Sequence, residues 1–417
     1  MAVEHVCVIG LGYVGLPTAA VLASRGIRVT GVDVNPKTVG SINAGKPHII
    51  EPDLDMVVHG AVSKGQLTAR TEPVEADAFI IAVPTPFADG HKPDLSYLQS
   101  ATEAIAPGLK KDDLVVVEST VPVGATLQVR NWLAGLRSDL SFPDPDRPDD
   151  AHDVCIAHSP ERVLPGRVLL ELVRNDRVIG GLGHDCAACT KALYSIAVEG
   201  EMHLTTAATA ELVKLSENAY RDVNIAFANE LANVAGPLGI NVREVVKLAN
   251  YHPRVNILNP GPGVGGHCIA VDPWFIASTA PDRTPLIQTA RRVNDARPAA
   301  IAEQISALAS VQGGATIACF GLSYKADIDD LRESPSIHVV EELRKRLANP
   351  ILVIEPHIEA LPESLAGLPA VSISSIEAAL KTAACLVLLT DHRAFSAVRD
   401  EDLSGKDVID TRGFWVS

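Results

Sequence analysis

The sequence is poor in aromatic residues, lacks any excess of positive charge and contains no long apolar run. Aromatic side chains make up only 4% of the 417 residues, so the cores must be built from Ala, Val, Ile and Leu, as is common in α/β folds. The formal net charge of -15 argues against non-specific binding to nucleic acid or to an anionic membrane. It does not exclude anionic ligands, because helix N-termini and a few local cations can hold phosphates.

No segment approaches the roughly 18 apolar residues that a membrane-spanning helix requires. The N-terminal segment MAVEHVCVIG has no basic stretch followed by an apolar stretch and a cleavage site, and it is predicted to be a first strand. We therefore expect a cytoplasmic protein. With 47% hydrophobic and 21% charged residues the chain has a globular composition, and its length predicts two or three domains.

The seven cysteines also favour a reducing compartment, because their number is odd and most of them lie in apolar, strand-like runs. The cysteines in such runs are Cys7, Cys155, Cys319 and Cys385. Cys186 and Cys189 form a CxxC pair that has no second pair or histidine beside it in the sequence. Helix packing is the first interpretation of this pair, and a zinc or redox function is the alternative.

Short apolar runs alternate with helical periodicity from the N-terminus onward, which predicts a parallel sheet covered by helices on both faces. The predicted strands are HVCVIG, IRVTGVD, AFIIAVP, LVVVEST and DVCIAHS. The acidic, proline-rich stretch 138–153 interrupts this rhythm and is predicted to be a solvated surface loop.

The pattern changes to one long helix over about 206–236, followed by another helical stretch over about 285–304. Strand and helix then alternate again through ATIACFGLSY, ILVIEP, CLVLLTD and KDVIDTRG. The predicted fold class is α/β, with two Rossmann-like lobes joined by a helical middle domain. The expected boundaries are 1–205, 206–300 and 301–417.

A dinucleotide-binding motif follows the first predicted strand. Gly10, Gly12 and Gly15 form a GxGxxG pattern that opens a helix, and Asp33 ends the second predicted strand. The first two glycines permit a tight turn and close approach to a pyrophosphate, and the third lets helix and strand pack closely. Asp33 would accept hydrogen bonds from the ribose hydroxyls and repel a 2′-phosphate, so NAD is favoured over NADP.

The most unusual segment is NPGPGVGGHCIAVDPWF, which carries Cys268 and, four residues later, Asp272. If a helix begins near Cys268, both residues lie on one face and the helix end lowers the thiol pKa; a buried structural cysteine is the alternative. Lys214 and Asn218 are neighbours on one face of the long helix, for which a solvated polar face is the simpler interpretation. Glu161 follows a predicted strand, so its carboxylate is expected at the ligand-facing edge, with a surface loop as the alternative.

A thiol next to a nicotinamide has one particular use. An aldehyde has no hydride to give until a nucleophile adds to it, whereas a thiohemiacetal can lose a hydride and become a thioester that water hydrolyses. Cysteine together with NAD therefore indicates an oxidation that ends in an acid.

These motifs together resemble the UDP-glucose/GDP-mannose dehydrogenase family over nearly the whole chain. The matching segments are GLGYVGLPTA, PTP, EST with VGAT, SPERVLPGR, AELVKLSENAYRDVNIAFANEL, GPGVGGHCIAVDPWF, FGLSYKADIDDLRESPS and DTRG. Within the family, GVGGHCIAVDPWF with YHPRVNIL before it looks most like the enzymes that oxidise UDP-N-acetyl-D-mannosamine. The UDP-glucose enzymes usually carry Lys immediately before the Asp, where this chain has Val271, and this departure favours a 2-acetamido sugar.

The resemblance implies a four-electron, NAD-dependent oxidation of a UDP-sugar at C6, without a metal. It implies that Cys268 is the nucleophile, that Lys214, Asp272 and Asn218 handle the proton and the oxyanion, and that Glu161 and Thr120 serve thioester hydrolysis. The implied cofactor-binding residues are Gly10, Gly12, Tyr13, Val14, Gly15, Asp33, Pro84, Thr85, Thr120 and Arg332. The implied substrate-binding residues are Glu161, Arg162, Val163, Lys214, Asn218, Arg221, Arg254, Gly265, His267 and Lys325. Arg254 would act from the neighbouring subunit of a homodimer that forms through the middle helices.

Three other functions stay open from the sequence. The same chemistry could act on UDP-N-acetylglucosamine or UDP-glucose, and a comparison of kcat/KM on the three sugars would separate them. A catalytically silent nucleotide-binding protein would keep the fold, but the intact Cys, Lys, Asn and Glu argue against it. A two-electron dehydrogenase resembling the 6-phosphogluconate enzymes would need no cysteine in a GGHC loop.

Overall fold

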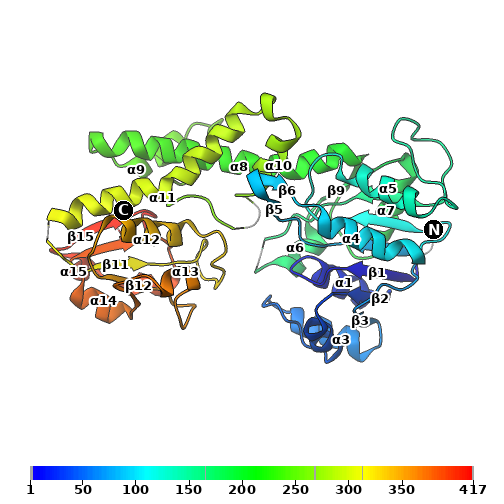
Figure 1. Cartoon of the computed structure of the whole chain (residues 1–417), viewed down its shortest axis with the longest axis horizontal. Coiled ribbons are helices and arrows are strands. Elements are labelled where there is room, and N and C mark those ends of the chain that lie inside the picture. The colour runs from blue at the N-terminus through cyan, green and yellow to red at the C-terminus, as the bar shows by residue number, and fades with distance from the viewer. Residues whose placement is uncertain (1–2, 165, 267–268, 312, 416–417) are drawn as a thin grey trace. The chain divides into compact units, whose positions relative to one another are not determined.

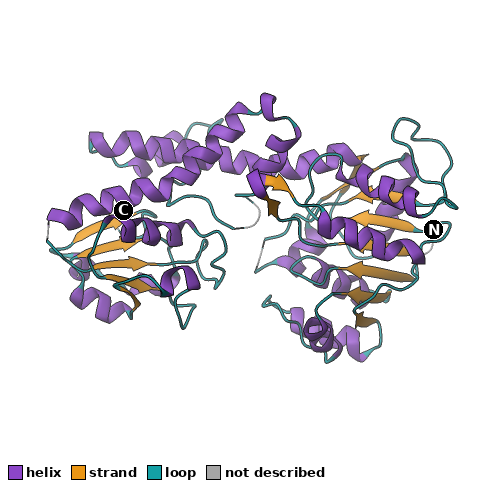
Figure 2. Ribbon diagram, in the orientation of Figure 1, coloured by secondary structure: helices purple, strands orange, loops and turns teal. Residues whose placement is uncertain are grey.

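The computed structural model of the chain describes residues 3–164, 166–266, 269–311 and 313–415. It divides into two compact units, Met1–Ser216 and Glu217–Ser417. Each unit contains a sheet covered by helices, as the strands and helices in Figures 1 and 2 show. The boundary between the units lies inside helix α8 (Ala207–Ala235), which confirms the single long helix predicted there. The proposed division into three domains stays a prediction.

The sheet of the first unit has the strand order β10-β9-β8-β7-β4-β1-β2-β3. The strands in that order are β10 (Met202–Thr206), β9 (Arg177–Gly181), β8 (Cys155–His158), β7 (Leu114–Val117), β4 (Ala78–Ile81), β1 (His5–Ile9), β2 (Arg28–Val32) and β3 (Leu67–Arg70). From β3 to β8 all neighbours are parallel. This part is a Rossmann sheet, in which ligands bind where the chain order reverses, between β1 and β4.

The prediction of a parallel sheet needs one correction at the β8–β9 pair. β9 joins β8 antiparallel, and β10 then pairs with β9 in parallel. Because β10 is largely exposed and contains His, Thr and Thr, it lacks the apolar run that reveals a buried strand. The sequence pattern also did not predict a small antiparallel hairpin of β5 (Phe87–Ala88) and β6 (Lys92–Pro93).

Alternate residues of β1 face two separate cores. Val6 and Val8 lie in one apolar cluster, whereas Cys7 and Ile9 lie in the other. This is the period of two that a strand buried on both faces requires. The helices of this unit are α1 (Gly15–Ser24), α2 (Pro36–Asn43), α3 (Leu54–Ser63), α4 (Ser96–Ile105), α5 (Ala125–Leu136), α6 (Val168–Arg174) and α7 (His184–Tyr194).

The second unit contains a fully parallel sheet with the order β13-β12-β11-β14-β15. Its strands are β13 (Val371–Ile373), β12 (Ile351–Ile354), β11 (Ile317–Phe320), β14 (Cys385–Leu388) and β15 (Asp407–Asp410). Its helices are α9 (Val242–Ala249), α10 (Asp272–Thr279), α11 (Pro285–Val311), α12 (Pro335–Arg346), α13 (Glu363–Ala366), α14 (Ile376–Thr382) and α15 (Asp400–Leu403). The second Rossmann-like lobe predicted from the sequence is therefore confirmed.

The CxxC pair is not isolated in the folded chain, contrary to the interpretation of the sequence. Helix α7 packs on β8 and brings Cys186 close to His152 and Cys155, which come from the end of the acidic loop and the start of β8. The thiol of Cys155 contacts both Cys186 and Cys189. No local pattern predicts this proximity, because the two pairs lie far apart along the chain.

Candidate active site

The glycine-rich turn after β1 has the form that a bound pyrophosphate requires. Gly10 has a φ of +91°, and a Cβ atom there would lie 2.5 Å from the carbonyl oxygen of Ala82. A Cβ at Gly15 would lie 1.9 Å from the carbonyl oxygen of Gly10, so helix α1 can approach the turn only with glycine at this position. At Gly12, by contrast, a Cβ would meet open space, which leaves room for a ligand against the backbone.

Asp33 is the second feature of the predicted dinucleotide site. Its carboxylate accepts the backbone N–H of Leu11 at 3.2 Å and that of Asn35 at 2.9 Å, so it is tied to the glycine-rich turn. A carboxylate has further acceptor positions that can serve two ribose hydroxyls. Tyr13 is 48% exposed and Val14 is half-buried at the start of α1, beside the same turn. These residues fit a dinucleotide.

The loops after β4 and β7 are joined directly. The hydroxyl of Thr85, which follows exposed Pro84, donates to the carbonyl of Thr120 at 2.6 Å. Ser119 donates to the carbonyl of Val83 at 2.7 Å. Two of the predicted cofactor residues, Thr85 and Thr120, are thus brought together at the carboxyl edge of adjacent strands.

Glu161 lies in a buried ionic cluster that the sequence did not reveal. Its carboxylate pairs with Arg177, whose Nη1 also lies 3.1 Å from Oε1 of Glu118. The Arg177 guanidinium stacks 4.2 Å above the ring of Tyr194, and the Tyr194 hydroxyl donates to Glu118 at 3.0 Å. Burial raises the pKa of Glu118 to about 6, although Arg177 acts in the opposite direction. Arg177 therefore holds the carboxylate that was predicted to assist hydrolysis.

Arg177 carried only a weak signal in the sequence. It begins the apolar run RVIGG, where a charged residue would ordinarily mark the exposed end of a strand. Its side chain is buried instead because two carboxylates meet it, one following β7 and one following β8. Glu118 belongs to the EST segment but was not named as a site residue.

Lys214, half-buried in α8, lies close enough to His158 for its charge to affect that ring. His158 ends β8 and is completely buried, and among the described residues neither of its ring nitrogens has a hydrogen-bond partner. Burial, with a smaller contribution from Lys214, lowers the pKa of His158 to about 3. A neutral ring is therefore the group that faces this lysine from β8.

Asn218 and Asp272 meet, as the predicted site requires. The Asn218 amide Nδ2 donates to Oδ2 of Asp272 at 2.6 Å, and both side chains are buried. Asp272 is the first residue of α10, which begins there rather than near Cys268. The described residues 269–271 are not helical, so the predicted helix start near Cys268 is not found there. Cys268 itself, with His267, lies outside the described residues.

The glycines before Cys268 pack against the loop that follows β11. A Cβ at Gly265 would lie 2.5 Å from the carbonyl oxygen of Glu333 and 2.8 Å from Cβ of Tyr324. A Cβ at Gly266 would lie 2.8 Å from the Tyr324 ring. Only glycines let these two loops approach so closely, and the GPGVGG segment thereby comes next to the segment that contains Lys325.

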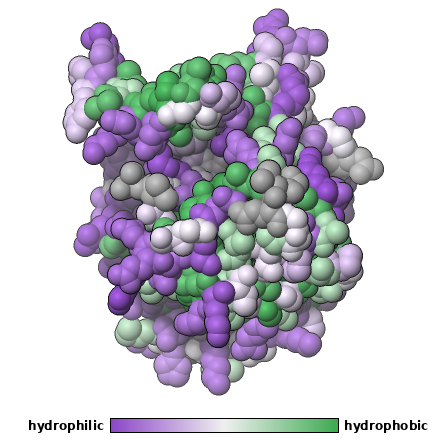
Figure 3. All heavy atoms as spheres, turned by 90° about the vertical axis from the view of Figure 1, so that its left-hand side faces the viewer, coloured by the Kyte–Doolittle hydropathy of each residue, from purple (hydrophilic) through white to green (hydrophobic). Residues whose placement is uncertain are grey.

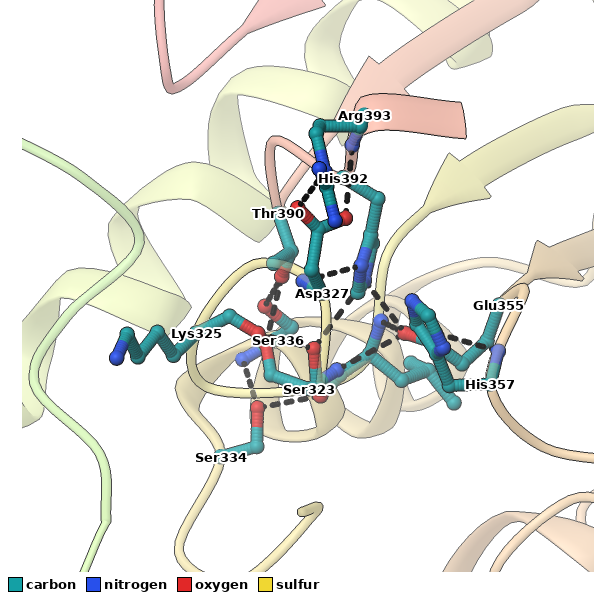
Figure 4. Close-up of polar contacts among 11 residues, drawn as sticks. Ser323, Lys325, Asp327, Ser334, Ser336, Glu355, His357, Thr390, His392 and Arg393 are labelled. Atoms are coloured by element: carbon teal, nitrogen blue, oxygen red, sulfur yellow. Dashed lines mark hydrogen bonds and ion pairs between the residues drawn. The ribbon is translucent and has the colours of Figure 1, made fainter. Parts of the chain in front are cut away.

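A buried hydrogen-bond network fixes the Lys325 loop (Figure 4). His392 accepts the N–H of Asp327 at its Nδ1, at 3.0 Å, so its Nε2 carries the proton and donates it to Glu355, also at 3.0 Å. Ser323 donates to the carbonyl oxygen of Lys325 at 2.7 Å. The Lys325 side chain points away from this network, which leaves its ammonium group available for a ligand.

The remaining predicted residues lie in loops or on exposed helix faces. The Arg332 guanidinium donates two hydrogen bonds to Asp330 in its own loop, at 2.8 and 2.6 Å. Arg162 donates to the carbonyl of Asp176 at 3.3 Å, next to half-buried Val163. Arg221 and Arg254 are exposed. Arg162 and Val163 belong to the first unit, and Arg221, Arg254 and Arg332 belong to the second.

No helix within the described residues is long and apolar enough to span a bilayer. Three models of the UDP-glucose/GDP-mannose dehydrogenase family match the chain in order. They are the NAD binding domain at residues 4–198, the central domain at 208–296 and the UDP binding domain at 318–417.

Relatives match over the full length. An NDP-N-acetyl-D-galactosaminuronic acid dehydrogenase of Ralstonia nicotianae is 55% identical over 98% of this chain and 96% of its own. A UDP-N-acetyl-D-mannosamine dehydrogenase of Yersinia pestis is 54% identical over 100% of both chains. Among solved structures, a UDP-D-ManNAc dehydrogenase of Pyrococcus horikoshii has a TM-score of 0.87 and 38% identity, covering 98% of this chain and 96% of that one.

A Rossmann lobe whose glycine-rich turn is tied to an acidic residue after the second strand is typical of NAD-dependent dehydrogenases. The family matches cover all three regions of the chain. The chain therefore belongs to the UDP-glucose/GDP-mannose dehydrogenase family and is an NAD-dependent nucleotide-sugar dehydrogenase.

Proposed function

We propose that the chain oxidises the C6 alcohol of a UDP-2-acetamido sugar to the carboxylate, with UDP-N-acetyl-D-mannosamine as the substrate. The observation that carries this choice is the 54% identity, over the whole of both chains, to a UDP-N-acetyl-D-mannosamine dehydrogenase. Val271, which stands where the UDP-glucose enzymes usually have Lys, supports a 2-acetamido sugar. The three-part division at 205 and 300 belongs to this proposal.

Removal of the C6 hydroxyl proton is assigned to the polar residues around Asp272. NAD, when bound, accepts a hydride from the sugar carbon in each of the two oxidation steps. Lys214 and Asp272, the latter oriented by the Asn218 amide at 2.6 Å, orient the hydroxyl or a water molecule, and the Asp272 carboxylate receives the proton. The Lys214 ammonium and Asn218 then stabilise the developing negative charge on the oxygen.

The second oxidation requires covalent help from Cys268. Its thiolate adds to the C6 carbon of the aldehyde, and the carbonyl oxygen takes up a proton to give a thiohemiacetal. Loss of that proton and of a hydride leaves a thioester. Water, guided by Glu161 and Thr120, then attacks the thioester carbon, the C–S bond breaks, and the carboxylate and the free thiol are released.

Substrate binding is assigned to both units. In the first, Arg162 and Val163 follow Glu161; in the second, Lys325, Gly265, His267 and Arg221 contact the sugar nucleotide. Arg332 contacts the cofactor.

A panel of UDP sugars with NADH counted per mole of sugar tests the proposal. We expect two NADH per sugar and the highest kcat/KM with UDP-N-acetyl-D-mannosamine. UDP-glucose lacks the acetamido group, and UDP-N-acetylglucosamine has the other configuration at C2. The polar contact that each sugar loses should lower its kcat/KM by about 10-fold to 10²-fold. One NADH per sugar, or no reduction with any UDP sugar, would contradict the four-electron reaction.

A second substrate has specific support. The Ralstonia nicotianae relative, 55% identical, is named for N-acetyl-D-galactosaminuronic acid. The panel therefore includes UDP-N-acetyl-D-galactosamine. Preference for this sugar would keep the 2-acetamido assignment and change the substrate.

We extend the proposal to a homodimer formed through the middle helices, with Arg254 reaching the neighbouring subunit's substrate. Exposed apolar side chains gather on α8, the turn after it and α9, and Figure 3 shows apolar side chains together on the upper part of the face that includes α9. They include Phe227, Val234, Leu238, Ile240 and Leu248. Sedimentation of the full chain should give twice its mass; a monomer at micromolar concentration would contradict this arrangement.

A further inference from the structure

A cluster of three cysteines and one histidine lies in the first unit, away from the proposed active site. Cys155 is the first residue of β8, whereas His158 and Glu161 lie at and beyond the last residue of the same strand. The cluster therefore lies at the amino edge of the sheet, and the dinucleotide turn lies at the carboxyl edge. Nothing in the oxidation of a sugar requires thiols at this edge.

The two halves of the cluster have the spacing of a zinc site. His152 and Cys155 form an HxxC pair, and Cys186 and Cys189 form a CxxC pair at the start of α7. Residues three apart in a helix lie on the same face, so Cys186 and Cys189 can both face β8. The cluster offers three sulfur ligands and one nitrogen ligand, which is a set that zinc takes in structural sites.

The distances of His152 from Cys155 and Cys186 match tetrahedral coordination. Nε2 of His152 lies 3.6 Å from Sγ of Cys155 and 3.4 Å from Sγ of Cys186. Zinc bonds to sulfur and nitrogen at tetrahedral angles place such atoms about 3.6 Å apart. The ligand atoms of His152, Cys155 and Cys186 all lie within 4.8 Å of one another. Cys189 lies beside these three, and its thiol contacts that of Cys155.

Neighbouring groups orient the ligands as they do around protein-bound zinc. Nδ1 of His152 lies 3.0 Å from the backbone carbonyl oxygen of Asp150 and therefore carries the proton, which leaves the Nε2 lone pair directed at the sulfurs. Backbone groups of Ile156 and Gly183 make hydrogen bonds to the Cys186 sulfur. Cys186 is completely buried and Cys155 nearly so, whereas His152 and Cys189 are half-buried and leave a path for the metal.

We propose that His152, Cys155, Cys186 and Cys189 bind one Zn²⁺ ion in a structural site that fastens the end of the acidic loop and the start of α7 to β8. Four protein ligands fill the tetrahedral positions, so the site has no open position for catalysis. This inference departs from the sequence-based expectation that the protein has no metal, and it does not depend on the identity of the substrate.

Metal analysis of the full chain tests the site. Protein purified with a reductant and dialysed against EDTA should retain about one Zn²⁺ per chain, as a closed thiolate site does. The Cys186→Ala/Cys189→Ala double variant should lose it. Cys7→Ala, which removes a buried thiol from the same sheet, and Cys268→Ala, which removes the proposed nucleophile, should both retain it. Zinc kept by the double variant, or lost from Cys268→Ala alone, would overturn the assignment.

Cobalt keeps the proposal testable if the double variant does not fold. Wild-type protein stripped of metal and supplied with Co²⁺ under reducing conditions should show thiolate-to-cobalt charge transfer and the visible bands of tetrahedral Co²⁺. His152→Ala should change those bands, because one nitrogen ligand is lost. Wild-type protein that holds no zinc and gives no thiolate–cobalt spectrum would overturn the proposal, as would a disulfide between these cysteines in protein handled under reductant.

Discussion

Replacing Cys268 with Ala is expected to lower the rate of acid formation by about 10³-fold or more, because the aldehyde then has no covalent route to a second hydride transfer. The first oxidation does not use the thiol, so a single turnover should still give up to one NADH per sugar. The measurement is rapid-quench analysis of aldehyde and acid together with NADH counted per mole of UDP sugar.

Two further variants separate covalent catalysis from a structural effect. Cys385→Ala removes a buried thiol from β14 of the second unit and should leave the rate unchanged. Cys268→Ser keeps the size of the side chain but is a poor nucleophile at neutral pH, and it should resemble Cys268→Ala. Full activity in Cys268→Ala would show that acid forms without a thioester.

Most of the fold could be predicted from the sequence because its buried strands are continuous apolar runs. Each of the five runs named in the first lobe contains an observed strand, and the glycine-rich turn with Asp33 has the predicted geometry. β9 and β10 were not predicted, because β9 begins with an ionised residue and β10 is largely exposed. The antiparallel pairing of β9 with β8 depends on contacts that no local pattern encodes.

The candidate site could be predicted only in part, for a related reason. Asn218 and Asp272 were named from their segments, and they meet although 54 positions separate them. Arg177 and the cysteine–histidine cluster were missed because each depends on partners that are distant in the sequence. A buried arginine is recognisable only once Glu118 and Glu161 are known to face it, since burial without such partners would be too costly.

Replacing Arg177 with Ala is expected to destabilise the first unit by about 3–5 kcal/mol, since two carboxylates would then stay buried without a counter-charge. Arg177 is 3% exposed, and it contacts Glu118, Glu161 and the ring of Tyr194, so truncating it would leave both carboxylates shielded from solvent. For a unit of this size, such a loss corresponds to a decrease in Tm on the order of 10 °C, which calorimetry of the full chain can measure.

The same variant should also slow turnover, because Glu161 loses the partner that fixes its orientation for thioester hydrolysis. Arg147→Ala is the matched control: it breaks an exposed pair with Asp144 and should leave both Tm and kcat unchanged. Adding Glu118→Gln to Arg177→Ala removes one of the two uncompensated carboxylates and should recover part of the Tm but not the kcat. If Arg177→Ala kept the wild-type Tm, the cluster would not be an ionic network closed to solvent, and the positioning of Glu161 would need another source.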